Sequence, residues 1–494
     1  MSNYRCKACG FIYDNKKEKV PFERKRKKYR CPLCGRDKTH FEIADEFTDY
    51  EVNKVINSDL TPYNAVVVDK NNPSIERVEG CINCGMCTRT CKLREGMDDN
   101  EKFLTCLGCG QCILTCPKKV LQPKNDIYKF FDAKKEGKTC IAYIAPGARV
   151  SIGDEFGYKP GTILGTKLVG LLKKLGFKYV FDVTFAADLT IMEESKELLE
   201  RIKNGKNLPM ITSCCPSWVR YCEIYYPELL NNLTTCKSPI AMEGTIVKNY
   251  FAKLKNLDPD NIFTVAITPC TAKKWEIKRK NITDTDLVIT VRELSDYLNN
   301  TRIKFDKIKN CKFDKELGRG SGAGLIFGAT GGVLEAALRT ANFYETGKPL
   351  KKCNIISIRG YNGLKETNVT IGKRTLKVAA VDELKNAIPI LEQIKNGTCE
   401  YDYIEIMNCR GGCIGGGGQP TYKLPEEAFV KEKRIESLYK RDNELLWKNS
   451  YENKNIKKLY TDYLEYPGSE IAHELLHTTY TDRSEEKNIK LKKI

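Results

Sequence analysis

Cysteines at short, repeated spacings constrain the folding of this 494-residue chain more than any other feature of its sequence. A run of four cysteines with the spacing C-x-x-C-x-x-C-x-x-x-C occurs twice, and the second run ends in a Cys-Pro pair. Eight thiolates at these spacings are enough to hold two four-iron clusters. The two runs are Cys81, Cys84, Cys87 and Cys91, followed by Cys106, Cys109, Cys112 and Cys116. Because chance repetition of the spacing is negligible, we predict that this segment folds around two iron–sulfur clusters.

The double run resembles the two-cluster bacterial ferredoxins, in which the fourth cysteine of each run ligates the other cluster. Lys92 follows the first run where a proline is usual, which is a minor departure. We expect a ferredoxin-like α+β domain over residues 65–136, with a β-branched first strand at Ala65–Asp69. The resemblance implies that one 4Fe–4S cluster is held by Cys81, Cys84, Cys87 and Cys116, and the other by Cys91, Cys106, Cys109 and Cys112.

The rest of the composition argues against a disulfide scaffold and against a membrane protein. Disulfide scaffolds are short and secreted, whereas these 23 cysteines lie in a long chain that opens on Met1-Ser2-Asn3 without an apolar signal segment. The longest uncharged stretch, Gly320–Leu334, is too short and too rich in glycine to span a bilayer. The hydrophobic fraction of 41% and the charged fraction of 30% are typical of soluble globular proteins. We therefore predict a cytoplasmic protein of several domains.

Three further cysteine stretches lie later in the chain, at Ile211–Trp218, Thr268–Lys274 and Cys409–Cys413. In the first of them, two cysteines are adjacent. Neighbouring side chains in extended backbone point to opposite sides, so one thiolate can bind a metal while the other stays a free thiol. Four thiolates from the three stretches are enough for one more iron–sulfur cluster: Cys215, Cys270, Cys409 and Cys413. The alternative is a set of unrelated loops whose buried cysteines act as small hydrophobic residues.

In their order and spacing, the three stretches resemble the signatures of the iron-only (FeFe, diiron) hydrogenases, and the resemblance extends from about Ala65 onward. These enzymes catalyse the reversible reduction of protons to dihydrogen at an H-cluster, a 4Fe–4S cube bridged to a two-iron subsite. The resemblance implies that Cys215, Cys270 and Cys409 are terminal ligands of the cube. Cys413 is implied to ligate the cube and to bridge it to the subsite.

The subsite carries carbon monoxide, cyanide and a dithiolate, so the protein must hold it mainly by shape and hydrogen bonds. The resemblance implies that Lys273 donates to a cyanide. The residues implied to line the cofactor cavity are Pro146, Gly147, Ser238, Thr268, Phe327 and Met407. Three positions depart from the best-known members: Gly147 replaces a serine, Thr268 a methionine and Ile240 a frequent glutamine. These departures suggest a divergent subgroup and leave catalytic bias and oxygen tolerance open.

A proton relay is also implied by the resemblance, because a buried subsite needs a chain of donors to bulk water. Its members are Cys214, a water, Glu194, Thr234, Glu197 and Arg201. A free thiol with an ordinary pKa near ~8.5 suits reversible proton transfer. The spacing of the two glutamates and the arginine places them on one face of a predicted helix over Leu189–Lys203. Taken alone, that spacing is equally typical of an ordinary solvated helix face.

The segment from 137 to 428 is predicted to be the large α/β catalytic domain. Strands at Ile141–Ile144 and Tyr179–Val183 alternate with helices, including one with a leucine stripe from Leu164 to Leu175, which favours a largely parallel sheet. Ligand loops at strand ends fit the usual position of sites in such folds. The glycines of 322–332 do not match the dinucleotide-binding spacing, so we interpret them as sites of close backbone packing.

Residues 429–494 resemble the C-terminal helical belt, or small subunit, of the hydrogenases. This segment contains His473-Glu474-Leu475-Leu476-His477, which matches the zinc-protease pattern of two histidines one helical turn apart. The only other histidine is His40, near the other end of the chain, so a third histidine ligand is missing. We do not predict a peptidase.

Residues 1–44 form a separate module with two cysteine knuckles, and residues 45–64 are predicted to be a linker. The module resembles a shortened rubredoxin, which implies a mononuclear iron site; a structural zinc is the alternative. We expect aromatic side chains to pack around the metal: Tyr4, Phe11, Tyr13 and Phe41. The predicted ligands are Cys6, Cys9, Cys31 and Cys34, and the basic run Arg24–Lys28 lies between the knuckles.

The formal net charge of +18 overstates the charge of the metal-loaded chain, because bound clusters bring thiolates and a negative charge. A basic surface still favours an acidic electron carrier such as ferredoxin, and nucleic-acid binding is the competing interpretation of the same charge. The resemblance further implies hydrogenase maturation proteins as partners and an anaerobic setting. A dihydrogen sensor and an iron–sulfur assembly factor remain alternative functions, and the oligomeric state stays open.

Overall fold

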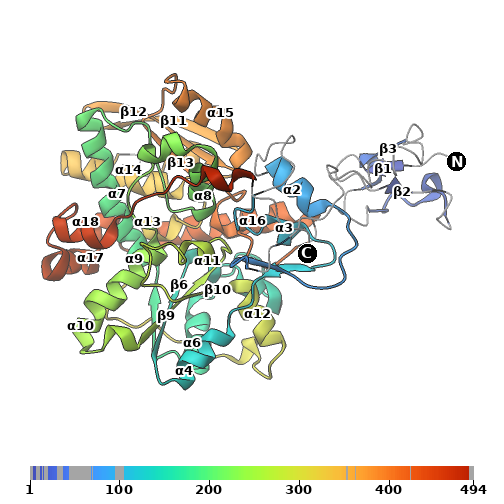
Figure 1. The fold of residues 1–494 in the computed structure, drawn as a ribbon, viewed down its shortest axis with the longest axis horizontal. Coiled ribbons are helices and arrows are strands. Elements are labelled where there is room, and N and C mark those ends of the chain that lie inside the picture. Colours follow the sequence, from blue (N-terminus) through green and yellow to red (C-terminus); the bar gives the residue numbers. More distant parts are fainter. Residues whose placement is uncertain are drawn as a thin grey trace.

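The computed structural model describes residues 4–6, 12–13, 15, 20–30, 37–43, 68, 71–94, 105–351, 354–361, 363–422 and 424–488. A small N-terminal sheet, a cysteine-rich segment and a large body follow one another along the chain (Figure 1). The linker predicted at 45–64 lies outside the described residues. Among the residues that are described, no helix combines the length and hydrophobicity that a bilayer crossing requires.

The N-terminal sheet has three antiparallel strands in the order β2-β1-β3: β1 (Tyr4–Cys6), β2 (Ile12–Tyr13) and β3 (Phe41–Ile43). Its core is the ring of Phe22, which is 2% exposed and contacts the rings of Tyr4, Tyr13, Tyr29 and Phe41. The sequence analysis named three of these rings but missed Phe22. Phe11 and the ligands predicted at positions 9, 31 and 34 lie outside the described residues, so the mononuclear metal site stays a prediction.

The cysteine-rich segment pairs two short antiparallel strands, β4 (Ile75–Arg77) and β5 (Leu121–Pro123), beside helices α2 (Met86–Arg94) and α3 (Gln111–Thr115). Gly110, with a φ of 70°, precedes α3 in a left-handed conformation that other residues rarely adopt. This turn lets α3 begin directly inside the second cysteine run. Most of the strand predicted at Ala65–Asp69 lies outside the described residues.

The large body contains two four-stranded sheets, which occupy opposite halves of the body in Figure 1. The first has the order β10-β9-β6-β7 and is parallel throughout. Its strands are mainly apolar and almost entirely buried because helices cover both faces of such a sheet. The strands are β6 (Thr139–Ile144), β7 (Tyr179–Asp182), β9 (Ile262–Thr268) and β10 (Leu287–Thr290). The predicted strands at 141–144 and 179–183 are confirmed.

The second sheet has the order β11-β12-β13-β8, and only its β11–β12 pair is antiparallel. The expectation of largely parallel strands is confirmed, and the structure divides these strands between two sheets. Gly372, with a φ of 59°, lies in the tight turn that makes β11 and β12 a hairpin at the edge. The strands are β8 (Met210–Ile211), β11 (Leu364–Ile371), β12 (Arg374–Asp382) and β13 (Tyr403–Met407).

Helices pack around both sheets. The predicted leucine-striped helix is α6 (Gly165–Leu175), and the predicted relay helix is α7 (Thr184–Asn204). The glycine-rich segment forms α13 and the start of α14, where a side chain on Gly324 would collide with the backbone oxygen of Thr184; the interpretation as close packing is therefore confirmed. The helices are α4 (Tyr128–Lys135), α5 (Pro146–Arg149), α6 (Gly165–Leu175), α7 (Thr184–Asn204), α8 (Pro216–Tyr225), α9 (Pro239–Ile246), α10 (Ala252–Lys255), α11 (Lys273–Glu276), α12 (Val291–Asn299), α13 (Gly322–Ile326), α14 (Gly332–Thr346), α15 (Leu384–Lys395), α16 (Leu424–Glu444), α17 (Lys454–Leu459) and α18 (Glu470–Leu476).

Candidate active site

Four cysteines converge where β8, β9 and β13 end, at the carboxyl edges of the two sheets. Burial raises the pKa of Cys270 to about 11, and Cys215 is close enough for its charge to raise it further. Burial also raises the pKa of Cys413, with further contributions from Cys270 and Cys215. Cys409 is buried on the loop that connects β13 to Cys413. The predicted convergence of the three stretches is therefore observed.

The residues around these cysteines fit a metal cluster. Cys215 is the N-cap of α8, where the helix dipole favours a thiolate, and the backbone N–H of Asn408 donates to its Sγ at 3.5 Å. The side-chain amide of Asn408 is buried without a hydrogen-bond partner among the described residues. Buried thiols with raised pKa values would be protonated at neutral pH, and a soft metal is what stabilises their thiolate form. The donor set therefore suits an iron–sulfur cube.

Cys214 lies beside this group, and its backbone oxygen accepts a hydrogen bond from Lys273 Nζ at 3.0 Å. Lys273 Nζ also donates to both carboxylate oxygens of Glu276, at 2.9 and 3.0 Å, and Ser238 Oγ donates to the same carboxylate at 3.0 Å. Burial raises the pKa of Cys214 well above the usual thiol value, and Glu194 raises it further. The expectation of an ordinary thiol pKa is therefore wrong for this structure.

The residues predicted to line the cofactor cavity fall into two groups. Phe327 and Met407 belong to one buried apolar cluster, against which Cys214 and Cys215 pack. On another side, a side chain on Gly147 would approach Pro269 Cγ at 3.0 Å and the backbone oxygen of Cys413 at 3.6 Å.

Thr268 and Pro146 shape the backbone close to the cysteines. Thr268 Oγ1 donates to the backbone oxygen of Cys270 at 3.1 Å and accepts from its N–H at 3.3 Å. Pro146 opens α5 directly before Gly147. The threonine that departs from the best-known members therefore stabilises the turn of a predicted ligand.

The outer part of the predicted relay is continuous in the structure. Thr234 Oγ1 donates to Glu197 Oε2 at 2.6 Å, and Arg201 donates to Glu197 Oε1 at 2.6 and 3.0 Å. The side chains of Glu197 and Arg201 are 13% and 10% exposed, so this end reaches towards solvent.

The inner part of the relay is buried and contains a residue that the sequence analysis missed. Burial raises the pKa of Glu194 to about 8, against the opposing effect of the hydrogen bond from the Tyr403 hydroxyl to its Oε1 at 2.6 Å. Between Glu194 and Thr234, both within the described part of the chain, no direct hydrogen bond is formed. No motif could reveal Tyr403, because it lies on β13, far from α7 in sequence.

The two cysteine runs are arranged as the ferredoxin resemblance implies. A small cavity beside Pro117 is lined by Cys81, Cys84, Cys87 and Cys116. In the second set, burial raises the pKa of Cys112, and Cys91 and Cys106 contribute the largest charge effects. Cys106 Sγ accepts from the Gly108 N–H at 3.4 Å and from Asn72 Nδ2 at 3.3 Å, which suits a thiolate ligand.

Gln111 joins the second cysteine run directly to the four-cysteine site. Its Nε2 donates to Cys409 Sγ at 3.1 Å and to the backbone oxygen of Gly415 at 3.0 Å. Thr271 Oγ1 strengthens the same contact by donating to the backbone oxygen of Gly108 at 2.7 Å. Gln111 was not predicted, because it occupies a position between Cys109 and Cys112 whose residue type the spacing pattern does not specify.

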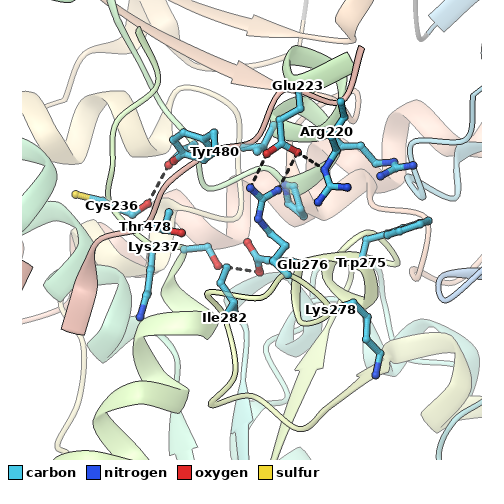
Figure 2. Close-up of a pocket in the computed structure, with 16 residues that line it drawn as sticks. Arg220, Glu223, Cys236, Lys237, Trp275, Glu276, Lys278, Ile282, Thr478 and Tyr480 are labelled. Atoms are coloured by element: carbon cyan, nitrogen blue, oxygen red, sulfur yellow. Dashed lines mark hydrogen bonds and ion pairs between the residues drawn. The ribbon is translucent and has the colours of Figure 1, made fainter. Parts of the chain in front are cut away.

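A pocket opens beside Glu276 (Figure 2), and Ser238 and Glu276 form part of its wall. Two contacts fix the outer wall. Arg279 forms an ion pair with Glu223 at 2.6 Å, and the Arg220 guanidinium lies over the Trp275 ring, 4.0 Å from its centroid. Lys273 therefore connects this wall, through Glu276, with the backbone of Cys214 beside the four-cysteine site.

Comparison with known proteins decides the family. The model of the iron only hydrogenase large subunit, C-terminal domain, matches residues 138–417, and that of the iron hydrogenase small subunit matches residues 428–483. The chain belongs to the iron-only hydrogenase family. It is 38% identical over 482 residues to Iron hydrogenase 1 of Clostridium pasteurianum, covering 92% of this chain and 83% of that protein.

Solved structures lead to the same family. An apo FeFe-hydrogenase variant from Chlamydomonas reinhardtii superposes with a TM-score of 0.63 at 38% identity, covering 70% of this chain and 94% of that one. Cytosolic iron-sulfur assembly component 3 of Mus musculus is more distant, at 28% identity over 73% of this chain and 79% of that protein. The predictions of a multidomain α/β hydrogenase fold and of an oxidoreductase acting on dihydrogen are confirmed.

Proposed function

We propose that the chain interconverts protons, electrons and dihydrogen at an H-cluster held by Cys215, Cys270, Cys409 and Cys413. The observation that carries this proposal is the convergence of cysteines from three separate stretches between Gln111 on one side and Cys214 on the other. When bound, the H-cluster supplies the redox chemistry of dihydrogen. The chain's own residues must hold it, exclude water and deliver protons.

Both apolar and charged residues would hold the cluster, each in a different way. Phe327 and Met407 are 6% and 2% exposed, so they keep bulk water away from the cysteines. The burial and position of Lys273 place its ammonium beside Cys214, where a positive charge favours anionic ligands. Glu276 orients that ammonium by accepting two of its hydrogen bonds. Donation by Lys273 to a bound cyanide requires the exchange of one of these three hydrogen bonds.

The proposed proton route begins at the Cys214 thiol. Burial keeps this thiol protonated at neutral pH, and a pKa of about 8 lets Glu194 hold or release a proton near neutrality. A water is needed between Glu194 and the Thr234 hydroxyl. Thr234 donates to Glu197, and Glu197 connects with Arg201 near the surface.

We further propose that electrons enter through the cysteine-rich modules. The cluster of Cys91, Cys106, Cys109 and Cys112 is then the last carrier, because Gln111 in the same run contacts Cys409. The cluster of Cys81, Cys84, Cys87 and Cys116 precedes it, and a mononuclear iron or zinc is held by Cys6, Cys9, Cys31 and Cys34. An acidic, ferredoxin-type protein in the cytoplasm is the proposed carrier, and hydrogenase maturation proteins are the proposed source of the subsite.

Infrared spectroscopy of the protein matured with its subsite tests the proposal. We expect bands of metal-bound carbonyl and cyanide, together with dihydrogen evolution from a chemically reduced carrier. A protein that contains zinc without iron–sulfur absorption would refute the cluster assignment. Intact bands with negligible turnover would indicate a dihydrogen sensor, and cubane clusters that never acquire the bands would indicate an assembly factor.

A further inference from the structure

A second group of metal-binding side chains lies at the outer end of the proposed proton route. One ligand atom each from Glu197, Cys236 and His477 lies within 4.8 Å of the other two. A carboxylate oxygen, a thiolate sulfur and an imidazole nitrogen are the three ligand types of protein zinc sites. None of these side chains belongs to the proposed ligand sets of the iron clusters.

The backbone fixes this group from three elements that lie far apart in sequence. Glu197 lies on α7, and its carboxylate accepts from the Thr235 N–H at 3.0 and 3.2 Å. Cys236 pairs with His477 in an isolated antiparallel bridge, and the Thr478 N–H donates to the Thr235 backbone oxygen at 2.7 Å. The three side chains are therefore held together before any ion binds, which lowers the entropic cost of binding.

The imidazole of His477 is oriented as a metal ligand requires. Its Nε2 lies 3.3 Å from Glu193 Oε2, and the Glu193 side chain is fully buried. This carboxylate fixes the tautomer in which Nε2 carries the proton and Nδ1 has a free lone pair, the arrangement found in carboxylate–histidine–zinc sites. Nδ1 faces the group: it lies 2.7 Å from Thr235 Oγ1, which is itself 3.2 Å from Glu197 Oε2.

The other two side chains leave one ligand atom each for an ion. Arg201 binds Glu197 through Oε1, so Oε2 is the oxygen that faces the group. Cys236 Sγ lies 3.7 Å from that oxygen, and Figure 2 shows the sulfur pointing away from the neighbouring pocket. On binding, the thiol releases its proton to solvent and the Thr235 hydroxyl turns its single proton away from His477 Nδ1, so that Zn–S, Zn–N and Zn–O bonds form.

We propose that Glu197, Cys236 and His477 form a binding site for Zn²⁺ or a similar borderline-soft divalent cation, and that the bound ion slows dihydrogen turnover. Soft and nitrogen ligands select against Mg²⁺ and Ca²⁺, which prefer oxygen alone. The inhibition rests on the proposed function, because Glu197 Oε2 is the oxygen that accepts the hydrogen bond of Thr234. An ion on this oxygen removes the acceptor from the proton route.

The test compares the cluster-loaded wild type with His477→Gln, Cys236→Ala and the control His473→Gln. His473 stacks on His477 with ring centroids 4.5 Å apart, but it is exposed and is not one of the three ligands. Zinc is added to each protein, and bound zinc is located by anomalous diffraction and counted after dialysis. Other zinc-binding cysteines contribute equally to all four proteins, so the difference between variants isolates this site.

We expect wild type and His473→Gln to hold one zinc more than His477→Gln and Cys236→Ala. The zinc concentration that halves turnover should rise at least tenfold in the two ligand variants, whose turnover without zinc stays near that of wild type. Equal zinc in all four proteins overturns the site, whatever the activity. Binding that disappears in the ligand variants without any zinc inhibition of wild type supports the site and overturns its effect on turnover.

Discussion

The neighbours of Cys409 and those of Cys214 differ in whether they can gain or lose a proton. Beside Cys409 lies the amide of Gln111, which neither gains nor loses a proton at neutral pH. Beside Cys214 lies Glu194, a buried acid with a pKa of about 8, and beyond it a hydroxyl and a carboxylate that form a hydrogen bond. On the proposed function, this difference implies that electrons and protons reach the cluster through separate parts of the protein. A change on one side should leave the other side intact.

The largest effect is expected for Cys214→Ala, which removes the first donor of the proton side. General acid–base groups contribute roughly 10²–10⁴-fold to rates, and no other described side chain replaces this thiol, so we expect turnover to fall by about 10³-fold. The iron content, the infrared bands and the cluster potentials should stay as in wild type. Near-normal turnover at full cluster occupancy would show that protons travel by another route.

Glu197→Gln should slow turnover by about 10²-fold, because the amide keeps the shape but cannot pass a proton on. The matched control is Glu200→Gln on the same helix, since the Glu200 side chain is 56% exposed and forms an ion pair with Lys196 at 3.3 Å. Turnover with a chemical reductant, measured at equal cluster content, separates the two variants. Equal rates in both would exclude Glu197 from the route.

The metal-binding parts of this molecule could be predicted from sequence because their information is local. Spacings such as C-x-x-C place ligands on one turn, and a 3.6-residue period reveals α7 without any knowledge of its neighbours. The pairing of Cys116 with the first run came from the ferredoxin resemblance rather than from spacing alone. The structure brings it into one cavity with Cys81, Cys84 and Cys87.

The neighbours that tune the site could not be predicted, because each comes from a distant part of the chain. Tyr403 reaches Glu194 across a sheet, and His477 reaches Glu197 from the C-terminal segment. The H-E-x-x-H pattern pointed to a pair of histidines on one helix face. In the structure the second histidine instead joins a carboxylate and a thiol from other elements. Burial also changed the expected pKa of Cys214, since a sequence does not reveal how dry a site is.

The pH dependence of the protein's free energy of unfolding should distinguish the buried acid Glu194 from a solvated one. Its pKa is about 8 in the folded chain against 4.5 as the ordinary value, so the folded state binds the proton more tightly. Stability should therefore fall as the pH rises from about 4.5 to about 8, because the unfolded chain ionises first. Glu194→Gln removes this contribution. We expect the midpoint of denaturant unfolding to fall less steeply with pH in the variant than in wild type; parallel slopes would contradict a raised pKa.

On the electron side, Gln111→Leu removes the hydrogen bond to Cys409 Sγ while keeping the side-chain size. Hydrogen bonds to cluster sulfur stabilise the reduced, more negative state, so the potential of the cube should fall. We expect a drop on the order of tens of millivolts, where about 59 mV is a tenfold change for a one-electron couple. Potentiometric titration measures it. The pH profile of turnover should not change, and a changed profile would break the separation of the two sides.

The smallest effect is expected farthest from the cluster, at the basic run of the N-terminal module. Arg26, Lys27 and Lys28 are exposed, while Lys25 lies over the rings of Tyr13 and Tyr29 at 5.1 and 5.6 Å. Exposed charges steer an acidic carrier, and salt screens them over a Debye length of about 10 Å at 0.1 M. Replacing Arg26, Lys27 and Lys28 by glutamine should raise the KM for a ferredoxin-type carrier a few-fold at low salt and flatten its salt dependence. Turnover with a small neutral reductant should be unchanged, and so should the infrared bands. If the variant loses activity with both donors, the module supports the fold of the protein rather than its encounter with the carrier.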